Sequence, residues 1–345
     1  MSEGDRPCID SWVVRLSSLG DIVQALALLG PLRSAGHRAG WICEARFARV
    51  FDFLVPELRV PCIAWDRTSS SLGRLAQRIR NFGGQPRCTI DIQGNLKSAL
   101  VARAVKAPCR YALSRRDLRE KFAALFRATR AEPARGPHVL DRGLAAIEVA
   151  TGRAWTRTEL SAPPVLENAP SALDASLRER VQEGAIVIVL QDPSDPRSLP
   201  IDLIEVLSKR LTDRSLVAVA GPRESAVSWP PPWKVVHQRG DVGELIALGT
   251  LVRERGAVVL GPDCGATHVL RMAGARTVFA FGPQDHLRTG PLPEVPGAAV
   301  VTRRAAEALP CQPCLAKRCA LAEGPRCMQE IAIDDIVQAL AVAGR

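Results

Sequence analysis

An aspartate stands near the start of the chain, where a short apolar run gives way to a helical pattern. Residues 12–33 are WVVRLSSLGDIVQALALLGPLR, and Asp21 follows a turn of small residues. From Ile22 onward, apolar residues recur with the three-and-four spacing that is typical of a helix with one buried face. The segment therefore predicts a strand, a tight turn and a helix that begins near Asp21. Open α/β sheets bind ligands at the carboxyl ends of their strands, so we expect a ligand crevice here.

Two roles are open for Asp21. Acidic side chains are common in the first turn of a helix, where they offset the positive end of the helix dipole. A carboxylate beside a ligand crevice is also suited to act as a general base. The pattern of this segment is compatible with both roles.

Two further segments place polar residues directly after apolar runs. Residues 88–99, CTIDIQGNLKSA, carry Asp91, Gln93 and Lys97 behind a strand-like run. Residues 261–268, GPDCGATH, lead from another strand-like run into a helical pattern. A helix that starts at the end of a strand presents backbone N–H groups to an anion such as a diphosphate.

Taken together, these segments resemble glycosyltransferase family 9, the family of the ADP-heptose:lipopolysaccharide heptosyltransferases. SSLGD at 17–21 resembles the N-terminal signature of that family, and residues 88–99 resemble its acceptor-side segment. DLREKFAALF at 117–126 resembles the basic helix that follows, and residues 261–290 resemble the donor motif. The order and spacing of the segments agree over most of the chain.

The resemblance implies a GT-B fold, an α/β architecture of two Rossmann-like domains that face each other across a cleft. It implies an inverting transferase that moves heptose from ADP-heptose to a lipopolysaccharide core or a related anionic acceptor, with Asp21 as catalytic base. The implied donor-binding residues are Ser194, Arg197, Asp263, Gly265, Thr267, His268, Gly282 and Pro283. The implied acceptor-binding residues are Ser18, Gly20, Gln93, Lys97 and Arg119. The ADP-sugar is a substrate, and no obligatory cofactor is implied.

Some positions depart from the family pattern. Pro262 and Cys264 stand where relatives often have asparagine and usually a small polar residue, and Arg197 and Leu199 replace a frequent lysine and a tryptophan. The reaction type is therefore better defined than the donor sugar. Two alternatives stay open: a family 9 transferase with another nucleotide sugar or a protein or polysaccharide acceptor, and a nucleotide-binding GT-B protein without catalysis. Without the motif, a core histidine is the better explanation of His268; the motif favours a ligand contact.

The length of 345 residues predicts two domains. We expect an acceptor-binding domain at 1–160, a nucleotide-sugar-binding domain at 161–330, and a helix within 331–345 that packs back on the N-terminal domain. The proline-rich stretch 152–170 marks the boundary. No apolar run approaches the roughly 18 residues of a membrane span. The N-terminal residues lack the basic and apolar parts of a secretory signal, which predicts a cytoplasmic protein.

The formal net charge of +10 comes almost wholly from arginine. Such a balance favours anionic partners. Aromatic residues make up only 4% of the chain, which leaves few side chains for base stacking, and no nucleic-acid-binding motif is present. We therefore expect no nucleic acid as partner, and favour an anionic glycolipid at the inner face of the cytoplasmic membrane.

Four of the ten cysteines form the cluster C-x2-C-x4-C-x7-C: Cys311, Cys314, Cys319 and Cys327. In a reducing compartment, such spacing favours metal binding or a structural thiol cluster over disulfides. Only the first pair has the usual chelating spacing. A structural zinc or iron site and a purely structural segment both remain open.

Strand-like and helical runs alternate along the chain, which predicts parallel sheets with helices on both faces. The expected strands are 12–16, 40–43, 60–64, 88–92, 185–190, 215–220, 234–237, 257–260 and 277–281. The expected later helices are 96–105, 117–128, 138–151, 201–211, 242–253, 266–272 and 334–343.

Overall fold

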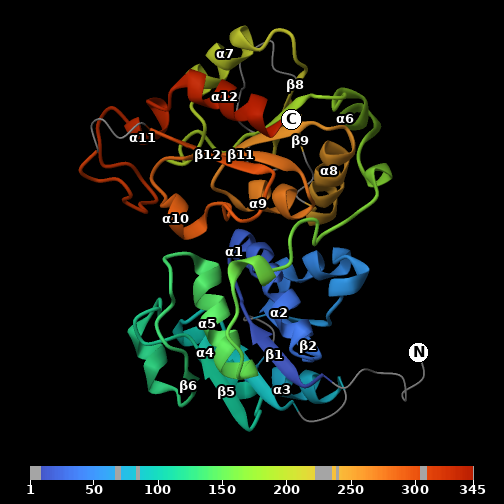
Figure 1. Ribbon diagram of the computed structural model, residues 1–345, viewed down its shortest axis with the longest axis vertical. Helices are drawn as coiled ribbons and strands as arrows, with labels where there is room; N and C mark the ends of the chain where they lie inside the picture. Colours follow the sequence, from blue (N-terminus) through green and yellow to red (C-terminus); the bar gives the residue numbers. More distant parts are fainter. Residues whose placement is uncertain are drawn as a thin grey trace. The chain divides into compact units, whose positions relative to one another are not determined.

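The computed structural model describes residues 9–66, 71–82, 86–221, 235–237, 241–303 and 309–344. The chain forms two compact units, Met1–Val165 and Leu166–Arg345 (Figure 1). The division falls inside the proline-rich stretch 152–170, slightly beyond the predicted boundary at residue 160.

The N-terminal unit is built on one sheet of parallel strands in the order β3-β2-β1-β4-β5-β6. Because the order runs outward from β1 and β4, it is the order of a Rossmann fold, with its switch point between these two strands. The strands are β1 (Ser11–Val14), β2 (Ala39–Glu44), β3 (Cys62–Trp65), β4 (Cys88–Asp91), β5 (Cys109–Ala112) and β6 (Thr129–Arg130). The helices are α1 (Leu19–Ala25), α2 (Leu29–Ser34), α3 (Leu72–Arg80), α4 (Leu96–Ala104) and α5 (Val139–Thr151).

The C-terminal unit repeats this topology, with strand order β12-β11-β10-β7-β8-β9. Its strands are β7 (Ile186–Val189), β8 (Leu216–Ala220), β9 (Val235–His237), β10 (Val258–Pro262), β11 (Arg276–Phe281) and β12 (Ala298–Thr302). Its helices are α6 (Ala175–Arg180), α7 (Ile201–Arg210), α8 (Val242–Glu254), α9 (Gly265–Met272), α10 (His286–Thr289), α11 (Arg326–Gln329) and α12 (Ile333–Ala343). Lys234, the first residue of one predicted strand, lies outside the described residues.

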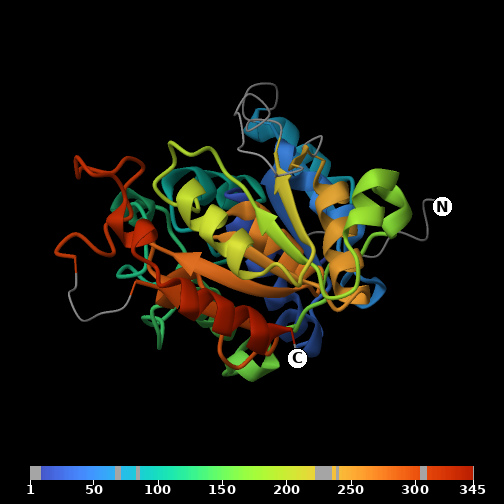
Figure 2. The same ribbon diagram turned by 90° about the horizontal axis from the view of Figure 1, so that it is seen from above.

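Helices cover both faces of the C-terminal sheet (Figure 2). Successive residues of β7 point to opposite faces: Ile186 and Ile188 pack with α7 and α12, whereas Val187 and Val189 pack with α6, α8 and α9. A strand buried on both faces needs apolar side chains throughout, which explains the continuous apolar run of β7. Both predicted parallel sheets are confirmed, as is the GT-B fold class.

Two predicted elements need correction. Residues 117–128 do not form a helix; only a 3-10 turn, η5 (Lys121–Leu125), is present. The backbone N–H groups of Arg119 and Glu120 both donate to the carbonyl of Gly94, so they are engaged outside any helix. The helix predicted after Asp21 is also interrupted, by the 3-10 turn η2 (Leu26–Leu28) between α1 and α2.

The last helix packs differently from the prediction. Its apolar face, formed by Ile336, Leu340 and Ala343, is buried in the core of the C-terminal unit, where α12 contacts β11, β12 and α7. The amphipathic helix thus covers one face of its own sheet with its apolar side. This apolar side does not pack on the N-terminal domain, contrary to the expectation for residues 331–345. Within the described residues, no helix is both long and apolar enough to span a membrane.

A close approach of two strands sets a first prediction. A Cβ atom added at Gly40 of β2 would lie 2.6 Å from the ring of Trp12, whose side chain is fully buried in β1. Gly40→Ala should therefore lower the free energy of unfolding of the N-terminal unit by about 1–3 kcal/mol through overpacking. Gly73→Ala is the control, because its added methyl meets only Ser71 Oγ at 3.7 Å. Denaturant unfolding followed by tryptophan fluorescence measures both; equal stability of the two variants would contradict the prediction.

Candidate functional site

Asp21 lies in the first turn of α1, directly beyond the carboxyl end of β1. Its Oδ2 accepts hydrogen bonds from the backbone N–H of Ser18 at 3.1 Å and from the Ser18 hydroxyl at 3.0 Å. Its Oδ1 lies 2.8 Å from Nη2 of Arg15, and the side chain is 20% exposed. Asp21 therefore caps the helix and keeps a partly exposed carboxylate at the strand end, and its role as general base stays a prediction.

Arg15, which the sequence analysis did not single out, contacts Asp21 directly. It is the first residue after β1, and its Nη1 donates to the carbonyl of Ile92 at 2.9 Å while Nη2 pairs with Asp21. The guanidinium therefore links the ends of β1 and β4 to the carboxylate. The sequence feature that could have identified Arg15 is its position two residues before the SSLGD segment.

Gln93 holds the turn that leads to Asp21. Its Oε1 accepts the backbone N–H of Leu16 at 2.5 Å and that of Ser17 at 3.3 Å, and the residue is 5% exposed. The side-chain oxygen is used up by these two contacts. The structure therefore places Gln93 as a positioning residue beneath the turn, while Ser18 is exposed and Gly20 is buried within α1.

A buried polar network organises the loop after β4. Asp91 Oδ1 accepts the N–H groups of Gln93 and Gly94, and Oδ2 accepts the hydroxyl of Ser98 at 2.8 Å. Asn95 caps α4 by accepting the Ser98 N–H at 2.9 Å. Burial raises the pKa of Asp91, although its hydrogen bonds act in the opposite direction. The polar residues of this motif thus fix the loop from below.

The other predicted acceptor residues are charged and exposed. Lys97 begins α4 beside Glu44, whose Oε1 is 3.8 Å from the lysine Nζ, and the lysine side chain is 45% exposed. Arg119 is exposed in the loop that contacts Gly94 through its backbone. Both side chains are available to an anionic ligand, Lys97 at the same strand ends as Asp21.

In the C-terminal unit, Asp263 and His268 form a pair at the end of β10. His268 Nε2 lies 2.8 Å from Asp263 Oδ1, and Thr289 donates to Asp263 Oδ2 at 3.2 Å. The ring of His268 also packs against Phe279, with 5.0 Å between the ring centres. The side chain of His268 is only 6% exposed and that of Asp263 is 12% exposed. This arrangement suits an aspartate that contacts a ligand and a histidine that orients it.

Thr267 is a core residue. It is fully buried, its hydroxyl lies 3.2 Å from the Cys264 thiol, and it fills the space above Gly261. The donor-binding role expected for Thr267 does not fit this burial; its part is to pack the first turn of α9. Gly265, the first residue of α9, is partly exposed and leaves that turn open to a ligand.

Arg197 and Ser194 lie in the loop after β7. The Arg197 guanidinium contacts both oxygens of Asp195, at 2.9 and 2.6 Å, and its Nη1 lies 3.5 Å from the carbonyl of Asp263. The hydrogen bonds and charge of Asp195 raise the pKa of Arg197. The backbone of exposed Ser194 is held by Asp192 at 2.9 Å. Arg197 thus joins the loop after β7 to the loop after β10. Asp195 holds the guanidinium in place, which the sequence analysis did not foresee.

Gly282 and Pro283 hold the cysteine-rich segment. The carbonyl of Gly282 accepts the side-chain amide of Gln312 at 3.0 Å, and that of Pro283 accepts the backbone N–H of Leu315 at 2.9 Å. A Cβ at Gly282 would lie 2.5 Å from Met328. Both residues are buried and take part in packing, and the donor contact expected for them stays a prediction.

The four clustered cysteines do not form a metal-binding group. Cys311, Cys314 and Cys319 are exposed, Cys327 is buried in the C-terminal core, and all four are free thiols. No group of three or more ligand side chains that could hold a metal occurs among the described residues. Burial and the neighbouring thiols raise the pKa of Cys327 to about 11, so it is protonated at neutral pH. The four side chains are thus free thiols in this structure, and the two alternatives for the cluster, a metal site and a purely structural segment, both stay predictions.

Comparisons with known proteins bear on the family and the fold. Residues 73–190 match the model of glycosyltransferase family 9 (heptosyltransferase). No curated protein sequence matches the chain. Among solved structures, a family 9 glycosyltransferase from Veillonella parvula aligns at 15% identity and a TM-score of 0.70, covering 99% of both chains.

Two structures from E. coli are also similar. Heptosyltransferase WaaC with ADP-2-deoxy-2-fluoro heptose aligns at 15% identity and a TM-score of 0.65, covering 96% of this chain and 99% of that one. ADP-heptose lps heptosyltransferase II aligns at 16% identity and a TM-score of 0.66, covering 97% and 98%. At these identities the likeness shows the fold.

The structural matches show a GT-B fold, and the family match covers residues 73–190 of that fold. The matched segment includes β4, α4 and the loop that carries Gln93.

The exposure of the thiols sets a second prediction. A thiol reagent applied to the native protein should modify Cys311, Cys314 and Cys319 quickly, because their side chains are exposed. Cys327 should react only after unfolding, because it is buried and protonated. Mass spectrometry of the peptides measures the order, and exposed Cys109 is the internal control. Protection of all three thiols together with stoichiometric zinc or iron would contradict the arrangement described above.

Proposed function

We propose that this protein is an inverting glycosyltransferase that moves heptose from ADP-heptose to a lipopolysaccharide core or a related anionic acceptor. The observation that carries the proposal is the carboxylate of Asp21, accessible beyond the end of β1 and held by Arg15 and Ser18. The heptosyltransferase family match and the E. coli structure named with an ADP-heptose analogue support the choice of donor.

In this proposal Asp21 takes the proton of the acceptor hydroxyl. The acceptor oxygen attacks the anomeric carbon from the face opposite the diphosphate, the bond from that carbon to the diphosphate oxygen breaks, and the configuration inverts. A base must be unprotonated before it accepts a proton, and the contact with Arg15 stabilises that charged form. Gln93 and Arg15 act as positioning residues, because they fix the turn and the carboxylate without facing the acceptor.

The donor is assigned to the C-terminal unit. Asp263, oriented by His268 and Thr289, is placed to accept hydrogen bonds from sugar hydroxyls. The open first turn of α9 at Gly265 offers backbone N–H groups to the diphosphate. Arg197 adds positive charge nearby, although Asp195 offsets part of it. These groups stabilise the leaving diphosphate, which carries the charge that develops in the transition state.

A second candidate keeps the reaction and changes the donor. The pairing of Arg197 with Asp195 reduces the charge available to a diphosphate, and Leu199 lies in the core, 5% exposed, where it cannot contact a sugar. Both positions depart from the family pattern. A family 9 transferase for another nucleotide sugar, or for a protein or polysaccharide acceptor, is the alternative that this observation favours. The accessible carboxylate of Asp21 speaks against a scaffold without catalysis.

The acceptor is proposed to be anionic because Lys97 and Arg119 present exposed charges on the N-terminal unit. Such charges attract phosphate and carboxylate groups. A glycolipid acceptor of this kind would bring the enzyme to the inner face of the cytoplasmic membrane, where we propose that it works.

The proposal predicts the effect of removing the base. Asp21→Asn keeps the shape of the side chain but cannot accept the acceptor proton, so turnover should fall by about 100-fold or more. Its loss of stability should be small, about 1 kcal/mol, since part of the capping contact remains. A steady-state transfer assay measures turnover, and thermal unfolding measures stability.

Asp141→Asn is the matched control. Asp141 occupies the same position in α5, caps that helix with His138, and pairs with Arg157 at 2.7 and 2.8 Å. Its replacement should cost similar stability or more, because both of its oxygens contact the guanidinium, and should leave turnover near the wild-type value. If Asp21→Asn retained normal turnover, or if both variants lost activity equally, Asp21 would not be the base.

A further inference from the structure

Two large apolar side chains on the N-terminal unit are left in solvent. Phe122 and Leu125, both on the 3-10 turn η5, are 73% and 80% exposed. Ala123 is the one residue of η5 that is buried. The turn therefore uses its smallest side chain for packing and presents its largest ones outward.

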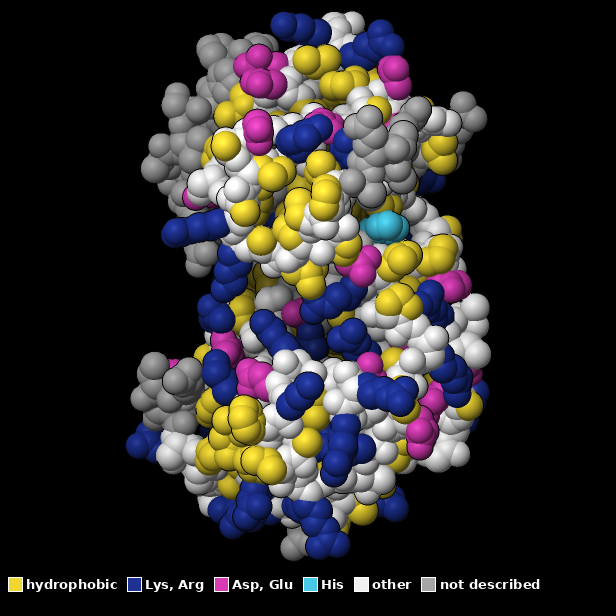
Figure 3. Space-filling model, turned by 90° about the vertical axis from the view of Figure 1, so that its left-hand side faces the viewer, with side chains coloured by type: hydrophobic (Ala, Val, Ile, Leu, Met, Phe, Trp, Pro, Cys, Tyr) yellow, Lys and Arg dark blue, Asp and Glu magenta, His cyan; other side chains and the backbone are white. Residues whose placement is uncertain are grey.

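Basic residues surround this turn. Arg115, Arg116, Arg119, Lys121 and Arg127 are all exposed. Two acidic residues lie in the same stretch, and Asp117 is directed inward, where it accepts hydrogen bonds from the Ser114 hydroxyl and the backbone N–H of Ala134. We call residues 115–127 the basic-apolar segment. Figure 3 shows hydrophobic side chains gathered among Lys and Arg side chains on the face of this unit.

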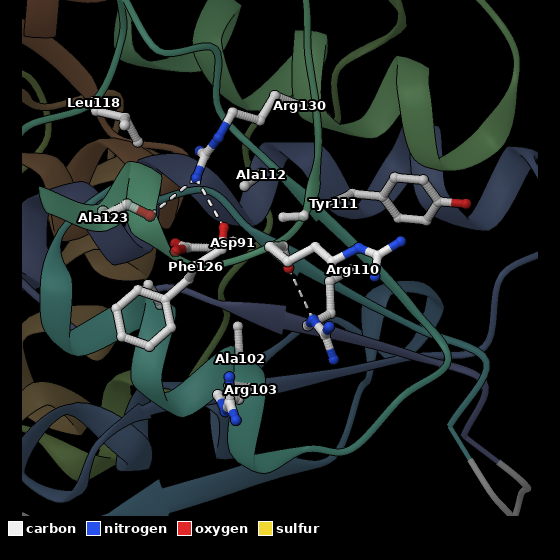
Figure 4. Close-up of a pocket in the computed structure, with 13 residues that line it drawn as sticks. Asp91, Ala102, Arg103, Arg110, Tyr111, Ala112, Leu118, Ala123, Phe126 and Arg130 are labelled. Atoms are coloured by element: carbon white, nitrogen blue, oxygen red, sulfur yellow. Dashed lines mark hydrogen bonds between the residues drawn. The ribbon is translucent and has the colours of Figure 1, made fainter. Parts of the chain in front are cut away.

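The basic-apolar segment is fastened to the domain by polar contacts over a cavity. The Arg130 guanidinium donates to the carbonyls of Ala123 and Phe126, at 2.9 and 3.2 Å (Figure 4). It also donates to the carbonyl of Leu113 at 3.1 Å. Behind it lies a cavity of about 30 Å³, lined by Ala99, Ala102, Tyr111, Ala112, Phe126 and Arg130. Neither Phe122 nor Leu125 lines this cavity. Packing within the domain therefore does not explain why these two positions carry large apolar side chains.

We propose that the basic-apolar segment binds the surface of an anionic lipid bilayer. Phe122 and Leu125 enter the boundary between headgroups and acyl chains, and the surrounding arginine and lysine side chains contact lipid phosphates. Apolar side chains that project from a rim of basic residues are complementary to such a surface in both polarity and charge. The inference deepens the proposed function, on which its choice of a membrane-borne acceptor rests.

A second copy of this chain is a poorer occupant of the same surface. A symmetric contact would bring each basic-apolar segment against its own duplicate. Five exposed basic side chains would then face five others, and like charges that are brought together oppose association. An anionic bilayer offers both an apolar region and negative charge, and it does so without this repulsion.

Vesicle co-sedimentation of the full-length protein tests the proposal. The protein should bind vesicles of phosphatidylcholine with about 30% phosphatidylglycerol, and should bind pure phosphatidylcholine much more weakly. The double variant Phe122→Ala/Leu125→Ala should bind the anionic vesicles at least about tenfold more weakly than the wild type, because two large apolar side chains are lost. Its melting temperature should be unchanged, because both side chains are exposed.

The control is Val206→Ala/Val342→Ala, which removes apolar side chains that are 48% and 63% exposed elsewhere, on α7 and α12. It should bind like the wild type. Equal binding of the Phe122/Leu125 variant and the wild type, or equal binding of neutral and anionic vesicles, would overturn the proposal. Self-association that the variant abolishes, without vesicle binding, would overturn it in favour of a dimer.

Turnover with a water-soluble acceptor fragment separates this inference from the proposed function. The Phe122/Leu125 variant should keep wild-type turnover on that fragment while its vesicle binding falls. Loss of turnover on the soluble fragment in this variant would overturn the membrane role of the segment. Absence of transfer by the wild type would instead count against the proposed function, and the vesicle result would stand on its own.

Discussion

The N-terminal site depends on one buried side chain that joins two strand ends. Gln93 Oε1 accepts the N–H groups of both Leu16 and Ser17, so the loop after β4 fixes the turn after β1. Backbone N–H groups that are buried without a partner destabilise a protein by about 1–3 kcal/mol each, so the turn has little freedom to move away. The carboxylate of Asp21 emerges from this turn, and Arg15 ties it to the same two strand ends.

The motif residues divide into those that hold loops and those whose polar atoms stay partly exposed at the strand ends. Asp91 and Gln93 in one unit, and Thr267 and Gly282 in the other, are buried and contact other protein groups. A smaller group at the strand ends keeps exposed polar atoms: Asp21, Lys97, Asp263 and Gly265. A motif can therefore identify a site even though most of its residues are buried and only support the loops that form the site.

The sequence predicted the fold better than the role of each residue. Strands with continuous apolar runs, such as β1 and β7, were found because burial on both faces requires that pattern. The half-exposed strand β5, CRYA, gave no such signal. Residues 117–128 have helical periodicity, although the N–H groups of Arg119 and Glu120 bond to the carbonyl of Gly94. Spacing alone could not distinguish Thr267, which fills the core, from Asp263, which faces outward, because burial depends on contacts distant in the chain.

The most direct test of the central claim is a mass-spectrometric assay of the purified protein with a panel of nucleotide sugars and an anionic lipopolysaccharide-core acceptor. The account predicts that ADP-heptose is consumed, that ADP is released, and that the acceptor gains one heptose with inverted anomeric configuration. Consumption of a different nucleotide sugar would keep the reaction and replace the donor. If no member of the panel were consumed with any acceptor while the protein remained folded, the assignment as a glycosyltransferase with Asp21 as its base would be contradicted.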